Sequence, residues 1–242
     1  MTLRQAQKLA RIDGLAGTPT KGPDVQVGSE PIGVALSPHG TRAYVANWVD
    51  GTVSAVDTDT MTLAKTINLN GTLAPFLGAG LTARPAMAHP RSFAVTNNGS
   101  GNDTDEFLYV TEYFGIRTAP EAADGSNADV SKQGIVYRVK LSNDNSETIT
   151  LAPLADMGFV AKTGETAGCF PNQLQSITLN GKFAYVVSVC ASPRGPSGVR
   201  TTALDCPSGP GAAGNDECDA AGTVEGACQA NLKCNGPTSR RT

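Results

Sequence analysis

The amino-acid sequence predicts an all-β fold built from repeated sheets, and two observations carry this prediction. A pattern of short strands joined by tight turns recurs three times along the chain. Turn-forming residues are abundant, with 27 glycines and 15 prolines among 242 residues. A repeat of this kind is typical of supersecondary units that bury their apolar faces only against neighbouring units. The length suits one large all-β domain or two smaller ones.

Each copy of the repeat begins at a proline, turns at a glycine and continues into an aromatic–aliphatic strand. The three copies are Pro31–Asn47, Pro90–Thr111 and Pro171–Val187. A tyrosine occupies the same strand position in every copy, at Tyr44, Tyr109 and Tyr185. Because these tyrosines recur at one position of a strand, we interpret them as residues that pack the sheets against one another.

The first copy, with the residues that follow it, predicts four antiparallel strands within about forty residues. Ser37-Pro38-His39-Gly40 has the residues that a type I turn prefers at its first, second and fourth positions. Strands are expected at Val34–Leu36, Ala43–Ala46, Thr52–Asp57 and Thr62–Leu69. Both faces of the second of these strands are apolar, which is typical of a sheet that lies between two other sheets.

The second copy repeats this plan with two insertions, and the third copy repeats only its first half. The insertions are residues 100–106 and 115–131. Residues 133–139 and 147–151 then predict the last two strands of the second copy. In the third copy, Asn180-Gly181 is the strongest hairpin signal in the chain.

Three regions are expected along the chain. Residues 1–24 predict an N-terminal segment that is either a short helix, over residues 2–11, or disordered. Residues 25–200 hold the repeated sheets, whose approximate bounds are 25–70, 85–155 and 168–192. Residues 201–242 have few β-branched residues and no aromatic residue, so we expect a cysteine-rich insertion or tail there.

The strings Tyr44-Val-Ala-Asn47 and Tyr109-Val-Thr-Glu112, each with an upstream proline and glycine, resemble the YVTN-type β-propeller repeat. That family occurs in bacterial extracytoplasmic proteins and in lactonase-like propellers of about seven blades. The resemblance covers about residues 25–192. It implies a partial, open-arc β-propeller of four-stranded antiparallel blades, about two and a half in number. Because a closed ring needs about four blades or more, we expect a longer parent chain to supply the remaining blades.

All six cysteines lie in the last third of the chain, from Cys169 onward. Their even number and loose spacing favour disulfides formed in an oxidising compartment, whereas zinc would need C-x₂₋₄-C pairs that the sequence lacks. The hairpin at Asn180-Gly181 brings Cys190 close to Cys169, so we predict a disulfide between these two residues. The pairing of the other four cysteines stays open. Together with the resemblance, the cysteines predict a periplasmic, cell-surface or secreted protein.

Charge and hydropathy exclude several classes of partner. The net charge is −3 and lysine and arginine form no cluster, so no nucleic-acid partner is expected. No apolar run is long enough to span a bilayer, and residues 1–26 lack the apolar region of a secretory signal. We expect no transmembrane segment in this chain, and an unidentified protein or small molecule as its ligand.

Four residues near the expected strand ends are candidate ligand contacts. Trp48, Glu112 and Tyr113 lie at or just after the end of the aromatic strand, and His89 precedes the proline that opens the second copy. Because loops on such scaffolds carry function, we expect these four side chains to contact a ligand if that end is the functional face. The alternative for His89 is an ordinary loop residue. No catalytic residue is expected, since the sequence has no G-x-S-x-G elbow and Ser92, Ser176 and Ser188 lack a partnering histidine within the repeat.

Residues Asp103, Asp105 and Glu106 form an alternating series of carboxylates that suits Ca²⁺. The series lacks the glycine and the distal bidentate glutamate of an EF-hand loop. A calcium site is therefore one interpretation, and a solvated loop is the other.

The sequence as a whole predicts a non-enzymatic binding or scaffold segment of an extracytoplasmic bacterial β-propeller protein. The alternative is a part of a propeller enzyme, either a lactonase-like hydrolase or a propeller fused to a c-type cytochrome. Only the likeness of fold supports this alternative, and a fold does not determine function.

Overall fold

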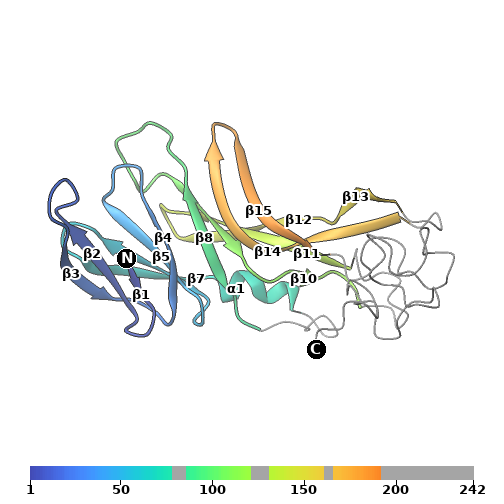
Figure 1. Ribbon diagram of the computed structural model, residues 1–242, viewed down its shortest axis with the longest axis horizontal. Helices are drawn as coiled ribbons and strands as arrows, with labels where there is room; N and C mark the ends of the chain where they lie inside the picture. Colours follow the sequence, from blue (N-terminus) through green and yellow to red (C-terminus); the bar gives the residue numbers. More distant parts are fainter. Residues whose placement is uncertain (78–85, 121–130, 161–165, 192–242) are drawn as a thin grey trace, which may run out of the picture. The chain divides into compact units, whose positions relative to one another are not determined.

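The computed structural model describes residues 1–77, 86–120, 131–160 and 166–191 (Figure 1). The segment 201–242, expected to be a cysteine-rich insertion or tail, lies outside the described residues. The chain divides into two compact units. The first unit consists of residues 1–120, 132–152 and 171–189. The described part of the second unit consists of residues 131, 153–160, 166–170 and 190–191.

The N-terminal residues form an antiparallel three-stranded sheet. Its strands are β1 (Thr2–Leu3), β2 (Lys8–Asp13) and β3 (Thr20–Gln26), in the order β1-β2-β3. The predicted helix over residues 2–11 is therefore wrong, and residues 1–24 are not a separate terminal segment. Leu9 of β2 is buried in one apolar cluster with Val27 and Val45, and this packing outweighs the weak helix preference of so short a segment.

The second sheet has the four strands that the first copy of the repeat predicts. They are β4 (Pro31–Leu36), β5 (Arg42–Asn47), β6 (Thr52–Asp57) and β7 (Thr62–Asn68), in the order β4-β5-β6-β7. Tyr44 of β5 pairs with Ala35 of β4 and with Ala55 of β6. Gly40 has a φ of 73° in the turn between β4 and β5, a conformation that explains the glycine at this position.

The third sheet repeats this order in the second copy. Its strands are β8 (Pro90–Val95), β9 (Phe107–Glu112), β11 (Lys132–Lys140) and β12 (Asn145–Leu151), and the short β10 (Ile116–Arg117) adds to the start of β11. Tyr109 of β9 pairs with Ala94 of β8 and with Arg138 of β11. An alanine of the preceding strand thus pairs with the tyrosine in both sheets, and the strand on the other side occupies the equivalent place in the repeat.

The third copy of the repeat forms a hairpin within a three-stranded sheet. The strands are β13 (Leu154–Val160), β14 (Thr166–Asn180) and β15 (Phe183–Ala191), in the order β13-β14-β15. The hairpin prediction is confirmed, with a loop at Gly181-Lys182, one residue later than expected. The sequence did not predict β13, which joins this sheet rather than the preceding one.

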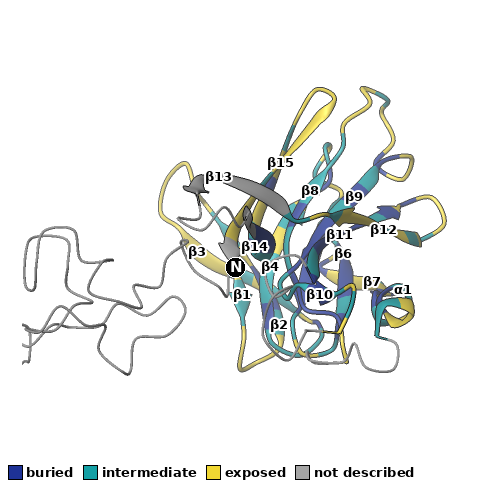
Figure 2. Ribbon diagram, turned by 90° about the vertical axis from the view of Figure 1, so that its right-hand side faces the viewer, coloured by how far each residue is buried: buried dark blue, intermediate teal, exposed yellow. Residues whose placement is uncertain are grey.

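Within the first unit, apolar clusters join the successive sheets. One cluster lies between the first and second sheets and includes Leu9 and Val45, and a larger one joins the second and third sheets through residues such as Val53 and Leu108. A third joins β11 to β14 and β15. Figure 2 shows β6 and β11 mostly buried and β15 mostly exposed. Antiparallel sheets stacked in chain order are the blades of a β-propeller, and the described residues form part of one.

Helical structure is confined to one turn each of α1 (Asn70–Leu73) and the 3₁₀ segment η1 (Ala74–Phe76), among the described residues. Neither segment approaches the length or apolar character that a membrane-spanning helix requires, and the described residues contain no other helix.

Candidate functional site

The structure brings the four predicted ligand-contact residues together at one end of the second and third sheets. Trp48 follows the last residue of β5, and His89 directly precedes β8. Glu112 is the last residue of β9, and Tyr113 follows it. The backbone N–H of Tyr113 donates to the carbonyl of His89 at 3.0 Å, so the end of β9 and the start of β8 are joined directly.

Four ring-bearing residues at this end contact one another, and we call them the aromatic cluster: Trp48, His89, Tyr113 and Phe114. The Trp48 ring centroid lies 5.0 Å from His89, 4.9 Å from Tyr113 and 5.9 Å from Phe114. Phe114 also lies 4.9 Å from His89 and 5.0 Å from Tyr113. Most of these contacts are edge-to-face, the arrangement that aromatic quadrupoles favour. Phe114 was missed from the sequence, although its position beside Tyr113 was a signal for it.

Glu112 lies beneath the aromatic cluster and is 0% exposed. Its carboxylate accepts hydrogen bonds from the His89 backbone N–H at 2.9 and 3.1 Å and from the Tyr137 hydroxyl at 2.7 Å. Buried polar groups require such partners, because an unpaired one loses its hydration without compensation. Glu112 therefore fixes the start of β8 and the position of His89. Its side chain lies away from solvent, in contrast to the direct ligand contact that we expected.

The loop that carries Phe114 is held by further hydrogen bonds within the first unit. The backbone N–H of Phe114 donates to Glu112 at 3.4 Å. The backbone N–H of the next residue, Gly115, donates to the side-chain oxygen of Asn172, a residue of β14, at 2.9 Å. Three sheets thus contribute to the position of the cluster, because Trp48 follows β5, Phe114 comes two residues after β9 and Asn172 lies in β14.

The aromatic cluster is partly open to solvent. Trp48, Tyr113 and Phe114 are half-buried, while His89 is only 9% exposed. Half-exposed rings held in fixed positions can stack on an apolar or aromatic group and can attract a cation to a ring face. This end of the sheets is therefore suited to binding.

The predicted calcium ligands are engaged by different hydrogen-bond donors. Asp103 is buried and accepts from the Ser37 hydroxyl at 2.6 Å, the Thr41 hydroxyl at 2.5 Å and the His39 backbone N–H at 3.0 Å. It also bonds the His39 Nδ1 at 3.0 Å. Burial alone would raise the pKa of Asp103, but the hydrogen bonds from Ser37, Thr41 and His39 outweigh burial and hold this pKa well below its usual range.

The other two carboxylates of this loop, those of Asp105 and Glu106, accept hydrogen bonds from other residues of the same loop. Glu106 accepts from the Thr96 hydroxyl and from the Asn98 backbone N–H, the latter at 2.7 Å. Asp105 accepts from the Ser100 hydroxyl at 2.8 Å. Within the described ranges, no three metal-ligating side chains gather at one point. The calcium site stays a prediction, for which calorimetric titration with Ca²⁺ is the test.

Cys169 of β14 is buried and takes part in a disulfide. The side chain of Cys190 lies outside the described residues, so its pairing with Cys169 stays a prediction.

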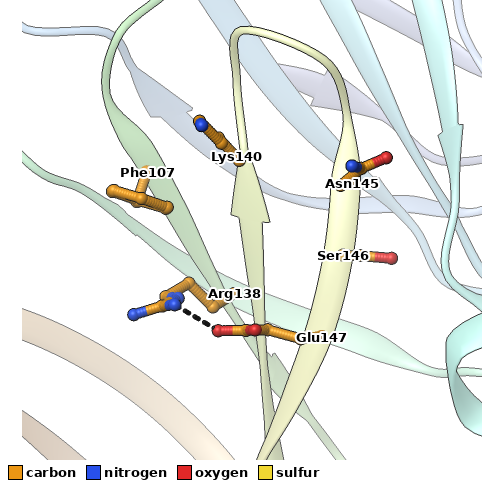
Figure 3. A pocket seen from close by; sticks show the side chains of 6 residues that line it. All are labelled: Phe107, Arg138, Lys140, Asn145, Ser146 and Glu147. Carbon is orange, nitrogen blue, oxygen red and sulfur yellow. Dashed lines mark ion pairs between the residues drawn. The ribbon is translucent and has the colours of Figure 1, made fainter.

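Two hollows on the described surface were not foreseen. One, of about 270 Å³, lies at the ends of β9, β11 and β12 and is shown in Figure 3. Its central cation, Arg138, forms an ion pair with Glu147 and lies 4.9 Å from the Phe107 ring centroid. The other, of about 360 Å³, is largely apolar and includes Leu9, Val34 and Leu36. Arg138 is thus paired within the hollow, whose lining also includes Lys140.

The sequence matches no protein-family model and no curated protein. Among solved structures, it is similar to Kuenenia stuttgartiensis hydrazine synthase, with 14% identity and a TM-score of 0.39 over 76% of this chain and 56% of that chain. Pseudomonas aeruginosa periplasmic gluconolactonase is 18% identical, with a TM-score of 0.34 over 75% of this chain and 56% of that one. A putative 6-phosphogluconolactonase from Bacteroides uniformis is 16% identical, with a TM-score of 0.33 over 80% and 67%.

The chain therefore spans a little over half the length of the first two structures that it resembles, at 56% of each. The blades are assigned from the strand order, the register and the packing described above, which repeat from sheet to sheet.

Proposed function

We propose that this chain is a non-enzymatic binding segment of an extracytoplasmic bacterial β-propeller protein, and that the aromatic cluster is its ligand contact. The observation that carries the proposal is the position of this cluster. Three half-exposed rings from two sheets are held together above a fully buried carboxylate. Such preorganisation lowers the entropy cost of binding, because the rings do not need to be ordered by the ligand.

The hydrogen bonds around His39, the second of the two histidines in the chain, support binding rather than catalysis. Ser37, His39 and Asp103 are the residue types of a hydrolase triad, and they lie together. In a working triad, however, the serine hydroxyl donates to the histidine and the carboxylate holds the far side of the ring. Here the Ser37 hydroxyl donates to Asp103 instead, at 2.6 Å. No imidazole is thus placed to take the proton of that hydroxyl.

The chemistry of the cluster favours a ligand with an apolar ring face or a cationic head. Aromatic side chains bind such groups by stacking and by cation–π attraction. The one carboxylate nearby, Glu112, is buried and already accepts several hydrogen bonds. Small molecules and the side chains of a partner protein both offer these groups.

The compartment and the wider assembly belong to the same proposal. The disulfide at Cys169 supports an oxidising location outside the cytoplasm. We propose that further blades, supplied by a longer parent chain, complete the propeller.

The emission of Trp48 is a direct test, because it is the only tryptophan of the chain. The full chain is titrated with tetramethylammonium, methyl β-glucoside and a phenylalanine-containing tripeptide, which represent a cation, a sugar ring and an aromatic peptide. At least one titration is expected to change the emission saturably. The Phe114→Ala variant should lose this change, and Val49→Ala, at the exposed residue beside Trp48, should keep it. No saturable change with any of the three probes would contradict the proposal.

A further inference from the structure

One side chain bonds the two backbone segments that carry Trp48 and His89 of the aromatic cluster. It belongs to Asn70, the first residue of α1. Its Nδ2 donates to the carbonyl oxygen of Asp50, two residues after Trp48, at 2.9 Å. Its Oδ1 accepts from the backbone N–H of Ala88, directly before His89, at 2.8 Å. Asn70 thus links the turn after β5 in the second sheet to the segment that leads into β8 in the third.

Both halves of the Asn70 amide are needed for this bridge. The amide oxygen must face the N–H of Ala88 and the amide nitrogen must face the carbonyl of Asp50, because an N–H donates and a carbonyl accepts. A carboxylate at this position would keep the first bond and lose the second, since it has no donor. A methyl group would lose both. The position therefore requires a short side chain with one donor and one acceptor.

The backbone that carries Asn70 is itself fixed. Leu69 and Leu73, before and after it in the sequence, are 0% exposed and belong to the apolar cluster that joins the second and third sheets. The backbone N–H of Leu69 donates to the carbonyl of Gly51 at 3.1 Å. The backbone N–H of Asn70 donates to the side-chain oxygen of Asn68 at 2.9 Å. Asn70 can therefore hold both segments rather than follow either of them.

Gly51 provides the space for the bridge. A Cβ atom at Gly51 would overlap the side-chain oxygen of Asn70 and would lie 2.9 Å from the carbonyl oxygen of Ala88. Its φ of 66° also favours glycine. Gly134 holds the equivalent place in the third sheet, and a Cβ atom there would lie 3.0 Å from the carbonyl oxygen of Pro171. The close approach of one sheet to the next is thus a general feature of the two copies.

The bridge itself does not recur in the second copy. Ile67 of β7 and Ile149 of β12 hold equivalent places, because each pairs with the valine two residues after the turn glycine. Three residues later the first copy has Asn70, whereas the second has Ala152, whose side chain cannot form a hydrogen bond. The asparagine therefore belongs to the sheet boundary that carries the aromatic cluster, and not to the blade pattern.

We propose that Asn70 is a positioning residue of the aromatic cluster, which holds the Trp48 and His89 segments at a fixed separation. The edge-to-face contact of these two rings, at 5.0 Å, depends on that separation. The consequence for binding rests on the proposed function of the cluster, because rings that are already fixed need not be ordered by the ligand. Loss of the bridge should leave the fold in place and weaken binding.

The first measurement needs no ligand. Acrylamide quenching of Trp48, the only tryptophan, reports how firmly its ring is packed. We expect Asn70→Ala to raise the quenching constant and to reduce the near-ultraviolet circular dichroism of the aromatic side chains, while a cooperative urea transition is retained. Asn70→Asp should give the same result, because it loses the bond to Asp50. This variant is nearly isosteric, so it carries the test should Asn70→Ala not fold.

The matched control is Asn68→Ala. It removes a hydrogen bond at the same end of α1 but leaves the bridge intact, so its quenching constant should equal that of the wild type. Isothermal titration calorimetry with tetramethylammonium, methyl β-glucoside and the phenylalanine-containing tripeptide then links position to binding. For each probe that binds the wild type, we expect about fivefold weaker affinity for Asn70→Ala and Asn70→Asp. Asn68→Ala should bind as the wild type does.

Four results would overturn the positioning role. The first is wild-type quenching in folded Asn70→Ala and Asn70→Asp chains, and the second is an equal change in Asn68→Ala. The third is wild-type quenching in Asn70→Asp alone, because the bond to Asp50 would then have no effect. The fourth is altered quenching with unchanged affinity. Absence of binding by the wild type would contradict only the proposed function, because quenching is measured without a ligand.

Discussion

The Ser37 hydroxyl donates a hydrogen bond to Asp103 at 2.6 Å and thereby ties the β4–β5 turn of one blade to the β8–β9 loop of the next. Thr41 and His39 of the same turn add further bonds to this carboxylate. One buried aspartate thus accepts hydrogen bonds from several donors of the neighbouring turn. We interpret Asp103 as a clamp between neighbouring blades.

Replacement of this carboxylate should destabilise the chain. Asp103→Ala removes the acceptor of the buried Ser37 hydroxyl and of the Thr41 hydroxyl, which we expect to lower the free energy of unfolding by about 1–3 kcal/mol. Urea denaturation followed by circular dichroism measures the change. Asp105→Ala removes an exposed carboxylate from the same loop and is the matched control, with an expected loss within about 0.5 kcal/mol. Equal losses for the two variants would contradict the clamp.

The clamp should also depend on pH in a definite direction. The pKa of Asp103 lies well below its usual value of about 3.9, because its hydrogen bonds outweigh the effect of burial. A carboxylate whose pKa is lower in the folded state stabilises that state above its unfolded pKa and loses this contribution as pH falls. The difference in unfolding free energy between wild type and Asp103→Asn should therefore be constant from pH 8 to about 5 and shrink below about pH 4. A difference that grows as the pH falls would be incompatible with this account.

The buried pair beneath the aromatic cluster gives a third prediction. Tyr137→Phe removes the hydroxyl that donates to Glu112 and should cost about 1–3 kcal/mol. Glu112→Gln should cost a similar amount and should shift the Trp48 emission to longer wavelength as the cluster opens. The double variant should show a coupling of at least about 0.5 kcal/mol, since the two side chains share a hydrogen bond. Additive losses would mean that the two residues act independently.

The disulfide of Cys169 is testable by mass mapping. Trypsin should release residues 163–182, which contain Cys169, and residues 183–194, which contain Cys190. Under non-reducing conditions we expect these two peptides to remain linked. Reduction of this disulfide should lower the free energy of unfolding by about 2–5 kcal/mol. A linkage of Cys169 to a different cysteine would disprove the predicted pairing.

The blade repeat could be predicted from the sequence because its signals are local. The proline, the turn glycine and the tyrosine at Tyr44 and Tyr109 predict a hairpin each, and the structure contains both. The first sheet was missed for a physical reason. Leu9 and its neighbours are compatible with either a helix or a strand, and only burial against Val45 of the next sheet decides between them.

Trp48, His89 and Tyr113 of the candidate site were named from the sequence, but Phe114 and the arrangement of the side chains were not. Trp48 and Tyr113 follow equivalent strands, so their proximity could be inferred from the repeat. The burial of Glu112 could not, because it depends on Tyr137, 25 residues away. Asp103 was one of three candidate calcium ligands, and that site stays a prediction. The hydrogen-bond donors that the structure gives to Asp103 lie 62 to 66 residues earlier in the chain. A contact between blades at that separation has no local signature.

Isothermal titration calorimetry of the Phe114→Ala variant tests the central claim, that the aromatic cluster binds a ligand, most directly. The ligand is the probe with the strongest saturable effect on Trp48 emission in the wild type. We predict that Phe114→Ala weakens its affinity at least tenfold while the unfolding transition of the chain is retained. Val49→Ala should bind as the wild type does. A folded Phe114→Ala chain with wild-type affinity would contradict the assignment of this cluster as the binding site.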